Sequence, residues 1–183
     1  MAARKVPSPT FLSRLREDVL SAGEYALCTL LLGTPFLPRA VRRLVLVAGG
    51  ADVRSSPGMS MSLTGSPRNL TMGVGVFCNR NVTIEAVAPV RIGSHSALGP
   101  QVLVVTSHHA LGNDGVWNEH ATGRPVDIGE RVWIGARVVV LPGAVIEDDV
   151  VVAAGAVVSG RLTSHGLYAG VPAKRIRELA AAG

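Results

Sequence analysis

The sequence predicts an all-β solenoid, in which short parallel strands stack coil upon coil around a narrow core. Two observations predict this fold: a six-residue spacing of aliphatic residues, and a composition rich in glycine and poor in aromatic residues. Glycine accounts for 21 of 183 residues, against three Phe, two Trp and two Tyr. Hydrophobic residues reach 48% and charged residues only 17%, a balance that excludes an intrinsically disordered chain.

Aliphatic residues recur every six positions through the C-terminal part of the chain. The longest phase comprises Ile128, Ile134, Val140, Ile146, Val152 and Val158. Two earlier phases comprise Leu70, Val76 and Val82, then Ile92, Leu98 and Val104. An α-helix cannot use this period, because residues six apart lie about 240° from one another around its axis. The period fits one hexapeptide per face and three faces per coil of about 18 residues.

The composition follows from such a solenoid. A narrow interior accepts Ile, Val and Ala but not large aromatic side chains. We expect glycine to occupy the tight corners, where a positive φ is needed.

Two segments interrupt the repeats. The phase shifts across residues 83–91, and residues 105–127 have no hexapeptide character. The second segment predicts an extended polar loop, which contains His108, His109 and His120. A loop of this length inside a regular solenoid is usually functional.

Residues 1–50 are predicted to form a separate helical region. Apolar spacing predicts one helix over residues 10–32 and a shorter one from Arg39 to Val47, ended by Gly49 and Gly50. We expect these helices to cover one end of the solenoid, with a basic peripheral membrane contact as the alternative. The solenoid is expected over residues 51–172, and a basic helix over residues 173–183.

The formal charge of +5 indicates an anionic partner. No basic cluster alternates with aromatic residues, so we do not expect nucleic-acid binding. Cys28 and Cys78 lack the spacing of metal ligands and are predicted to be free thiols. The polar N-terminus does not resemble a secretion signal, which favours a cytoplasmic location.

Three motifs and the histidine loop resemble the hexapeptide-repeat acyltransferases, in particular the maltose, galactoside and colanic-acid O-acetyltransferases. The motifs occupy Ile128–Ala136, Leu141–Ile146 and Ala169–Ile176, and the resemblance covers about residues 70–180. It implies a left-handed parallel β-helix, a homotrimer, acetyl-CoA as acyl donor, and active sites between neighbouring subunits.

Acetyl transfer from a thioester to a hydroxyl needs a base for the hydroxyl proton, and neutral histidine suits that role. Backbone N–H groups can stabilise the developing oxyanion. The resemblance implies His109 as general base, with His108 as the alternative. In an extended segment the two side chains point to opposite sides, so both cannot line one site.

The resemblance also implies residues that bind the two substrates. Asn79 matches a position that contacts the acceptor, although it could equally be a turn residue. The family often has an aspartate shortly after it; here Ala86 takes that place, and Glu85, one residue earlier, is expected to contact the acceptor instead. Positions that match CoA contacts are Trp133, Ala136, Ala154, Ser159, Gly160, Lys174 and Arg177. Alternatively, Trp133 packs against a neighbouring subunit, and the two basic residues form a solvated helix face.

The sequence therefore predicts an acetyl-CoA-dependent O-acetyltransferase that acts on a hydroxyl of a sugar, glycan or glycosylated small molecule. An N-acetyltransferase acting on an amino sugar, a serine-type O-acetyltransferase and a non-catalytic β-helix scaffold are the alternatives. No metal is expected, because His95, His109 and His120 lack the spacing of a zinc site.

Overall fold

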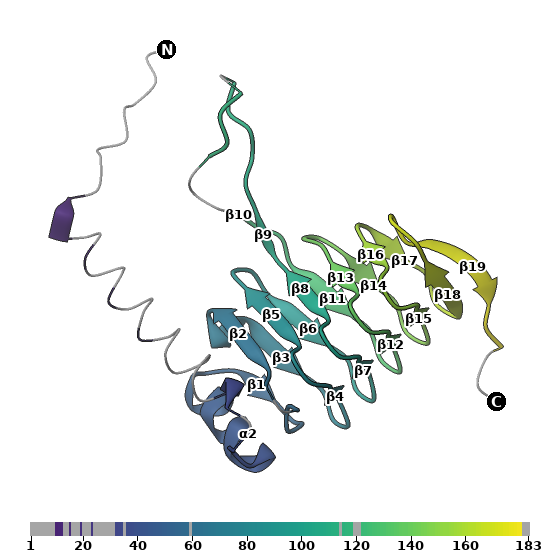
Figure 1. Cartoon of the computed structure of the whole chain (residues 1–183), viewed down its shortest axis with the longest axis horizontal. Helices are drawn as coiled ribbons and strands as arrows, with labels where there is room; N and C mark the ends of the chain where they lie inside the picture. The colour runs from purple at the N-terminus through teal and green to yellow at the C-terminus, as the bar shows by residue number, and fades with distance from the viewer. Residues whose placement is uncertain are drawn as a thin grey trace.

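The computed structural model describes residues 10–12, 15, 19, 23, 32–34, 36–58, 60–113, 115–118 and 122–180. These residues form a parallel β-solenoid with a helix at one end and a long loop that projects from its side (Figure 1). The predicted all-β solenoid is confirmed.

Three sheets form the walls of the solenoid, and each coil contributes a strand to each wall in turn. Sheet 1 consists of β1 (Asp52–Val53), β3 (Leu70–Met72), β6 (Val90–Ile92), β11 (Val126–Ile128), β14 (Val145–Ile146) and β17 (Arg161–Leu162). Sheet 2 consists of β4 (Phe77–Cys78), β7 (Ala97–Leu98), β12 (Trp133–Ile134), β15 (Val151–Val152), β18 (Gly166–Ala169) and β19 (Lys174–Glu178). Sheet 3 consists of β2 (Ser62–Gly65), β5 (Thr83–Ala86), β8 (Leu103–Val105), β13 (Val139–Val140) and β16 (Val157–Val158). A short 3-10 helix, η2 (Pro67–Asn69), precedes β3.

The six-residue pattern marks the core. All six residues of the longest phase are at most 1% exposed, and the two earlier phases are buried as well. The pairing register explains the period, because Ile134 lies opposite Leu98 in the preceding coil and Val152 in the next. Aliphatic side chains thus stack directly above one another along the solenoid axis.

The expectation that glycine fills the corners is only partly right. Many corner residues with positive φ are not glycine, among them Asn81, Gln101, Arg131, Arg137 and Asp149. Other glycines are required where successive coils approach closely. A Cβ on Gly99 would lie 2.8 Å from the backbone nitrogen of Ala136, and one on Gly93 would collide with the backbone of Gly129.

Helix α2 (Arg39–Ala48) covers the first coil and confirms the second predicted helix, with Gly49 at its C-cap. Its buried Arg42 donates hydrogen bonds to the carbonyl oxygens of Gly58 and Thr34 at 3.0 and 2.7 Å. Arg43 donates to the carbonyl oxygen of Val53 at 2.9 Å. These two arginines therefore bind the helix to the solenoid.

Most of the first predicted helix, residues 10–32, lies outside the described residues. Within the described part of the chain, no helix combines the length and the apolar character that crossing a membrane requires.

The predicted C-terminal helix is wrong. Lys174–Glu178 form strand β19, which pairs antiparallel with β18. A helix over residues 173–183 would be too short to be stable without tertiary packing, because nucleation is costly, whereas the free edge of β18 offers unpaired backbone groups. Arg175 strengthens the pairing of β19 with β18. Its guanidinium donates a hydrogen bond to the carbonyl oxygen of Ser164 at 2.6 Å and forms an ion pair with Glu178.

The predicted interruption of the repeats is confirmed. Between β8 and β11 the chain leaves the solenoid through a two-stranded ribbon of β9 (Ser107–His108) and β10 (Thr122–Gly123). Figure 1 shows this ribbon and its tip standing well clear of the coils.

Close stacking of coils makes the stability of the fold sensitive to Gly93. We expect Gly93→Ala to lower the melting temperature by about 2–12 °C, since overpacking costs ~1–3 kcal/mol and each kcal/mol shifts Tm by ~2–4 °C. Differential scanning fluorimetry measures this shift. Gly160→Ala is the matched control, because a Cβ at Gly160 would meet nothing within 4 Å. Equal melting temperatures for the two variants would contradict the stacking argument.

Candidate active site

The histidine loop is held firmly at its root. The fully buried Thr106 donates its hydroxyl to the carbonyl oxygen of Glu85 at 2.7 Å and accepts the N–H of Ala88 at 3.0 Å. The carboxylate of Glu85 accepts the N–H of Ser107 at 2.9 Å. Glu85 therefore positions the loop from the neighbouring coil, and its predicted contact with the acceptor stays a prediction.

His108 and His109 have different surroundings, although both are exposed. His108 ends β9 opposite Thr122, and its carbonyl oxygen accepts the Thr122 hydroxyl at 3.1 Å. The ring Nδ1 of His109 lies 2.8 Å from the carbonyl oxygen of Asn118. The rings of His109 and Trp117 form a T-shaped pair, with centroids 5.3 Å apart and planes at 84°.

The contact with Asn118 sets the tautomer of His109. A carbonyl oxygen only accepts hydrogen bonds, so Nδ1 must carry the proton in the neutral ring. The lone pair then lies on Nε2. Asn118 is itself fixed, because its N–H donates to the carbonyl oxygen of Ala110 at 2.8 Å. The loop therefore presents an oriented imidazole that can accept a proton.

An apolar hollow of about 320 Å³ lies over sheet 2. It brings together three of the residues predicted to contact CoA, namely Trp133, Ala136 and Ala154. The remaining lining residues are Gly135, Val151, Val152, Ala153 and Leu167. Trp133 is 60% exposed while its neighbour Ile134 is buried, so the tryptophan points outward as predicted.

Lys174 and Arg177 do not line this hollow, but they lie on β19, next to the strand β18 that contributes Leu167 to it. In the β18–β19 pair, Arg177 lies opposite Leu167 and Lys174 opposite Ala169. Both side chains are exposed, and neither forms an ion pair with another described residue. Ser159 and Gly160 lie exposed between β16 and β17 and do not line the hollow.

A single chain does not bring His109 to this hollow. The loop begins after β8 of sheet 3, whereas the hollow lies on β12 and β15 of sheet 2. Figure 1 shows the loop and these two strands on different sides of the solenoid.

Asn79 lines a smaller hollow of about 210 Å³ together with Arg39, Phe77, Cys78 and Arg80. Cys78 is a free cysteine, as predicted, whereas Cys28 lies outside the described residues. Burial raises the pKa of the Cys78 thiol to about 12, so this thiol remains protonated and does not serve as a nucleophile at neutral pH.

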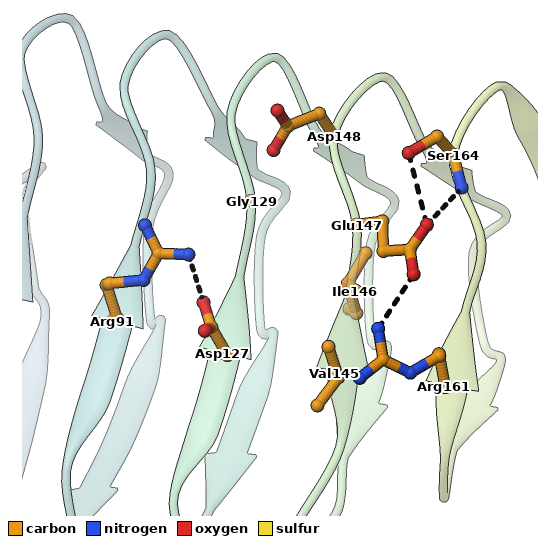
Figure 2. Close-up of a pocket in the computed structure, with 9 residues that line it drawn as sticks. All are labelled: Arg91, Asp127, Gly129, Val145, Ile146, Glu147, Asp148, Arg161 and Ser164. Carbon is orange, nitrogen blue, oxygen red and sulfur yellow. Dashed lines mark hydrogen bonds and ion pairs between the residues drawn. The ribbon is translucent and has the colours of Figure 1, made fainter.

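A third hollow, of about 360 Å³, crosses sheet 1 and was not expected from the sequence (Figure 2). Its charges are paired between coils: Arg91 with Asp127 and Arg161 with Glu147, each at 2.7 Å. The hydrogen bond from Arg161 is the largest cause of a lowered pKa of the Glu147 carboxyl group, and the hydrogen bond from the N–H of Ser164 is the next largest. Only the coil register reveals these pairs, since Arg91 and Asp127 are direct strand partners.

The described residues contain no group of three His, Cys, Asp or Glu side chains that could hold a metal. His120 lies outside these residues, so the expected lack of a metal stays a prediction.

Comparison with known proteins agrees with the repeats and the fold. A family model described as bacterial transferase hexapeptide (six repeats) matches residues 125–160. A solved hexapeptide-repeat acetyltransferase from Vibrio cholerae, complexed with acetyl coenzyme A, superimposes with a TM-score of 0.78 at 26% identity, covering 91% of this chain and 90% of that one. Residues 125–160 therefore match the hexapeptide-repeat transferases, and the described fold is similar to that of the solved acetyltransferase.

Curated relatives of this hexapeptide-repeat chain carry acetyltransferase names. A putative acetyltransferase of Schizosaccharomyces pombe is 39% identical over 115 residues, 61% of this chain and 54% of the relative. The galactoside O-acetyltransferase of Escherichia coli is 33% identical over 111 residues, 61% of this chain and 55% of the relative. The match thus spans about half the length of these relatives.

The Asn118 contact predicts a defined tautomer for His109. In two-bond ¹⁵N–¹H correlation spectra of the neutral ring, we expect His109 to show a protonated Nδ1 and an unprotonated Nε2. His109→Gln should remove this signal and His108→Gln should retain it. A ring protonated mainly at Nε2 would contradict the geometry.

Proposed function

We propose that the protein is an acetyl-CoA-dependent O-acetyltransferase that acetylates a hydroxyl of a sugar, glycan or glycosylated small molecule. The observation that carries this proposal is His109, whose Nδ1 is held by the Asn118 carbonyl oxygen at 2.8 Å. The relatives named as O-acetyltransferases and the similar structure complexed with acetyl coenzyme A support the reaction class. A scaffold protein would need no such oriented imidazole on an anchored loop.

His109 acts as general base and then as general acid. Its Nε2 removes the hydroxyl proton of the acceptor as the acceptor oxygen attacks the thioester carbonyl. The new C–O bond forms and the C–S bond breaks. His109 returns the proton to the departing thiolate, so the imidazole is neutral again after each turnover.

The apolar hollow on sheet 2 is the proposed site of the pantetheine arm. Trp133, Ala136 and Ala154 offer an uncharged wall for this chain. Lys174 and Arg177 on the adjoining β19 provide the cations for the CoA phosphates. Ser159 and Gly160 are proposed to lie near the nucleotide.

We further propose that the enzyme is a homotrimer and that each active site lies between two subunits. The separation of His109 from the sheet 2 hollow within one chain supports this arrangement. In the assembly, the loop of one subunit would place its histidine at the hollow of its neighbour.

Substitution of His109 tests the mechanism. We expect His109→Gln to lower kcat for acetyl transfer by about 10²–10⁴-fold, because the attacking hydroxyl loses its base. The measurement is release of free CoA thiol with a panel of glycosides and amino sugars. His108→Gln is the matched control and should stay within a few-fold of the parent. Full activity in both variants would overturn the assignment.

Mixing two inactive variants tests the shared site. His109→Gln retains the hollow, whereas Ala154→Trp fills the hollow and retains the loop. Co-expressed with different tags and purified as mixed trimers, the two should regain activity at about a third of the sites, those with an intact loop facing an intact hollow. Mixed assemblies that remain as inactive as either parent variant would place the site within one chain.

A further inference from the structure

The hollow at Asn79 is lined by hydrogen-bond donors and by no acid. Arg39 and Arg80 both line it, and none of its lining residues is Asp or Glu. The side-chain oxygen of Asn79 accepts the backbone N–H of Arg80 at 2.8 Å. That bond leaves the Nδ2 amide group of Asn79 to donate. Two guanidinium groups and one amide donor together favour an anion.

Neither arginine is neutralised by a neighbour that the structure describes. The ion pairs between described residues engage Arg54, Arg91, Arg131, Arg161 and Arg175, and leave out Arg39 and Arg80. The charge at this hollow therefore remains available to a ligand.

Arg39 is held in place before any ligand arrives. It begins helix α2, which Arg42 and Arg43 fasten to the first coil through backbone carbonyl oxygens. Its guanidinium lies over the ring of Phe77, 5.8 Å from the centroid, in the range of a cation–π contact. A charged group fixed in this way loses little conformational entropy on binding.

The order of strands in sheet 2 places this hollow beyond the acetyl end of the proposed CoA site. The order is β19-β18-β15-β12-β7-β4. Lys174 and Arg177 lie on β19 at one edge, the apolar hollow lies over β15 and β12, and Phe77 lies on β4 at the other edge. With strands about 4.8 Å apart, β4 lies roughly 10 Å beyond β12. The cations at β4 are therefore well separated from those proposed for the CoA phosphates.

We propose that this hollow binds an anionic group of the acceptor, either a carboxylate or a phosphate, and that Arg39 and Arg80 determine this specificity. The proposal rests on the proposed function, because only an acetyl transfer has an acceptor whose anionic group this hollow could bind. An acceptor of this class is a uronic acid or a sugar phosphate. The transfer step itself is unchanged.

Acceptor preference tests the proposal. The parent enzyme is assayed with methyl glucoside, methyl glucuronide and glucose 6-phosphate at saturating acetyl-CoA. We expect kcat/KM to be at least about tenfold higher for one or both anionic acceptors than for the neutral one, the value of one charge-assisted hydrogen bond. Preference for the glucuronide identifies a carboxylate, and preference for the sugar phosphate identifies a phosphate. Equal kcat/KM for all three would overturn the proposal.

Substitutions of the two arginines test whether they cause the preference for an anionic acceptor. Arg39→Met and Arg80→Met should each lower kcat/KM for the preferred anion by about tenfold and leave the neutral acceptor within about twofold. Arg39→Lys retains the charge and should retain part of the preference. Arg54→Met, an exposed arginine outside the hollow, is the matched control. An equal loss for anionic and neutral acceptors would show a structural role only and contradict the proposal.

A binding measurement separates this proposal from the proposed function. Isothermal titration calorimetry of methyl glucuronide and of inorganic phosphate with the CoA-free protein measures binding without any turnover. If no acceptor is acetylated yet one anion binds and Arg39→Met abolishes its binding, the proposed function fails and the anion site stands. If acceptors are acetylated without an anionic preference and neither anion binds, the anion site fails and the proposed function stands.

Discussion

The structure depends on the parallel hydrogen bonds that join each coil to the coils on either side. In sheet 2, for example, the N–H of Trp133 donates to the carbonyl oxygen of Val150 at 2.9 Å, and that of Gly135 donates to Val152 at 2.8 Å. Because this register repeats in all three walls, the aliphatic residue of each hexapeptide stacks on its counterpart in the next coil. The glycines follow from the same constraint, since a Cβ at Gly99 would meet the backbone of the coil above.

The rigid stack also explains how an irregular segment is held in place. The loop between β8 and β11 interrupts the repeat without breaking it, because β11 resumes pairing with β6 directly. The register therefore places the loop root beside Glu85 of the adjacent coil, where the carboxylate and the buried Thr106 hold it. The imidazole of His109 is thus carried by a projecting ribbon whose base is hydrogen-bonded to the adjacent coil.

Sheet 2 arranges two basic surfaces and the apolar hollow between them along one line. A basic edge at β19, an apolar hollow over β15 and β12, and a second basic hollow at β4 follow one another in strand order. This order is the order of the proposed binding sites for the CoA phosphates, the pantetheine arm and the anionic group of the acceptor. The paired charges on sheet 1 contrast with it, because Arg91 and Arg161 each have a carboxylate partner at 2.7 Å.

The sequence by itself determined the solenoid, the buried face of each hexapeptide, the break for the histidine loop and the short helix before the first coil. These features are local patterns, in which a spacing of six or a cluster of polar residues is visible along the chain. Only the tertiary structure decided the strand at Lys174–Glu178, the burial of Arg42 and the grouping of Arg39 with Asn79. Each of these depends on contacts between residues distant in sequence: the free edge of β18, the carbonyl oxygen of Gly58, and the coil on which α2 rests. Such contacts are set by coil register and by the seating of α2, which no local spacing encodes.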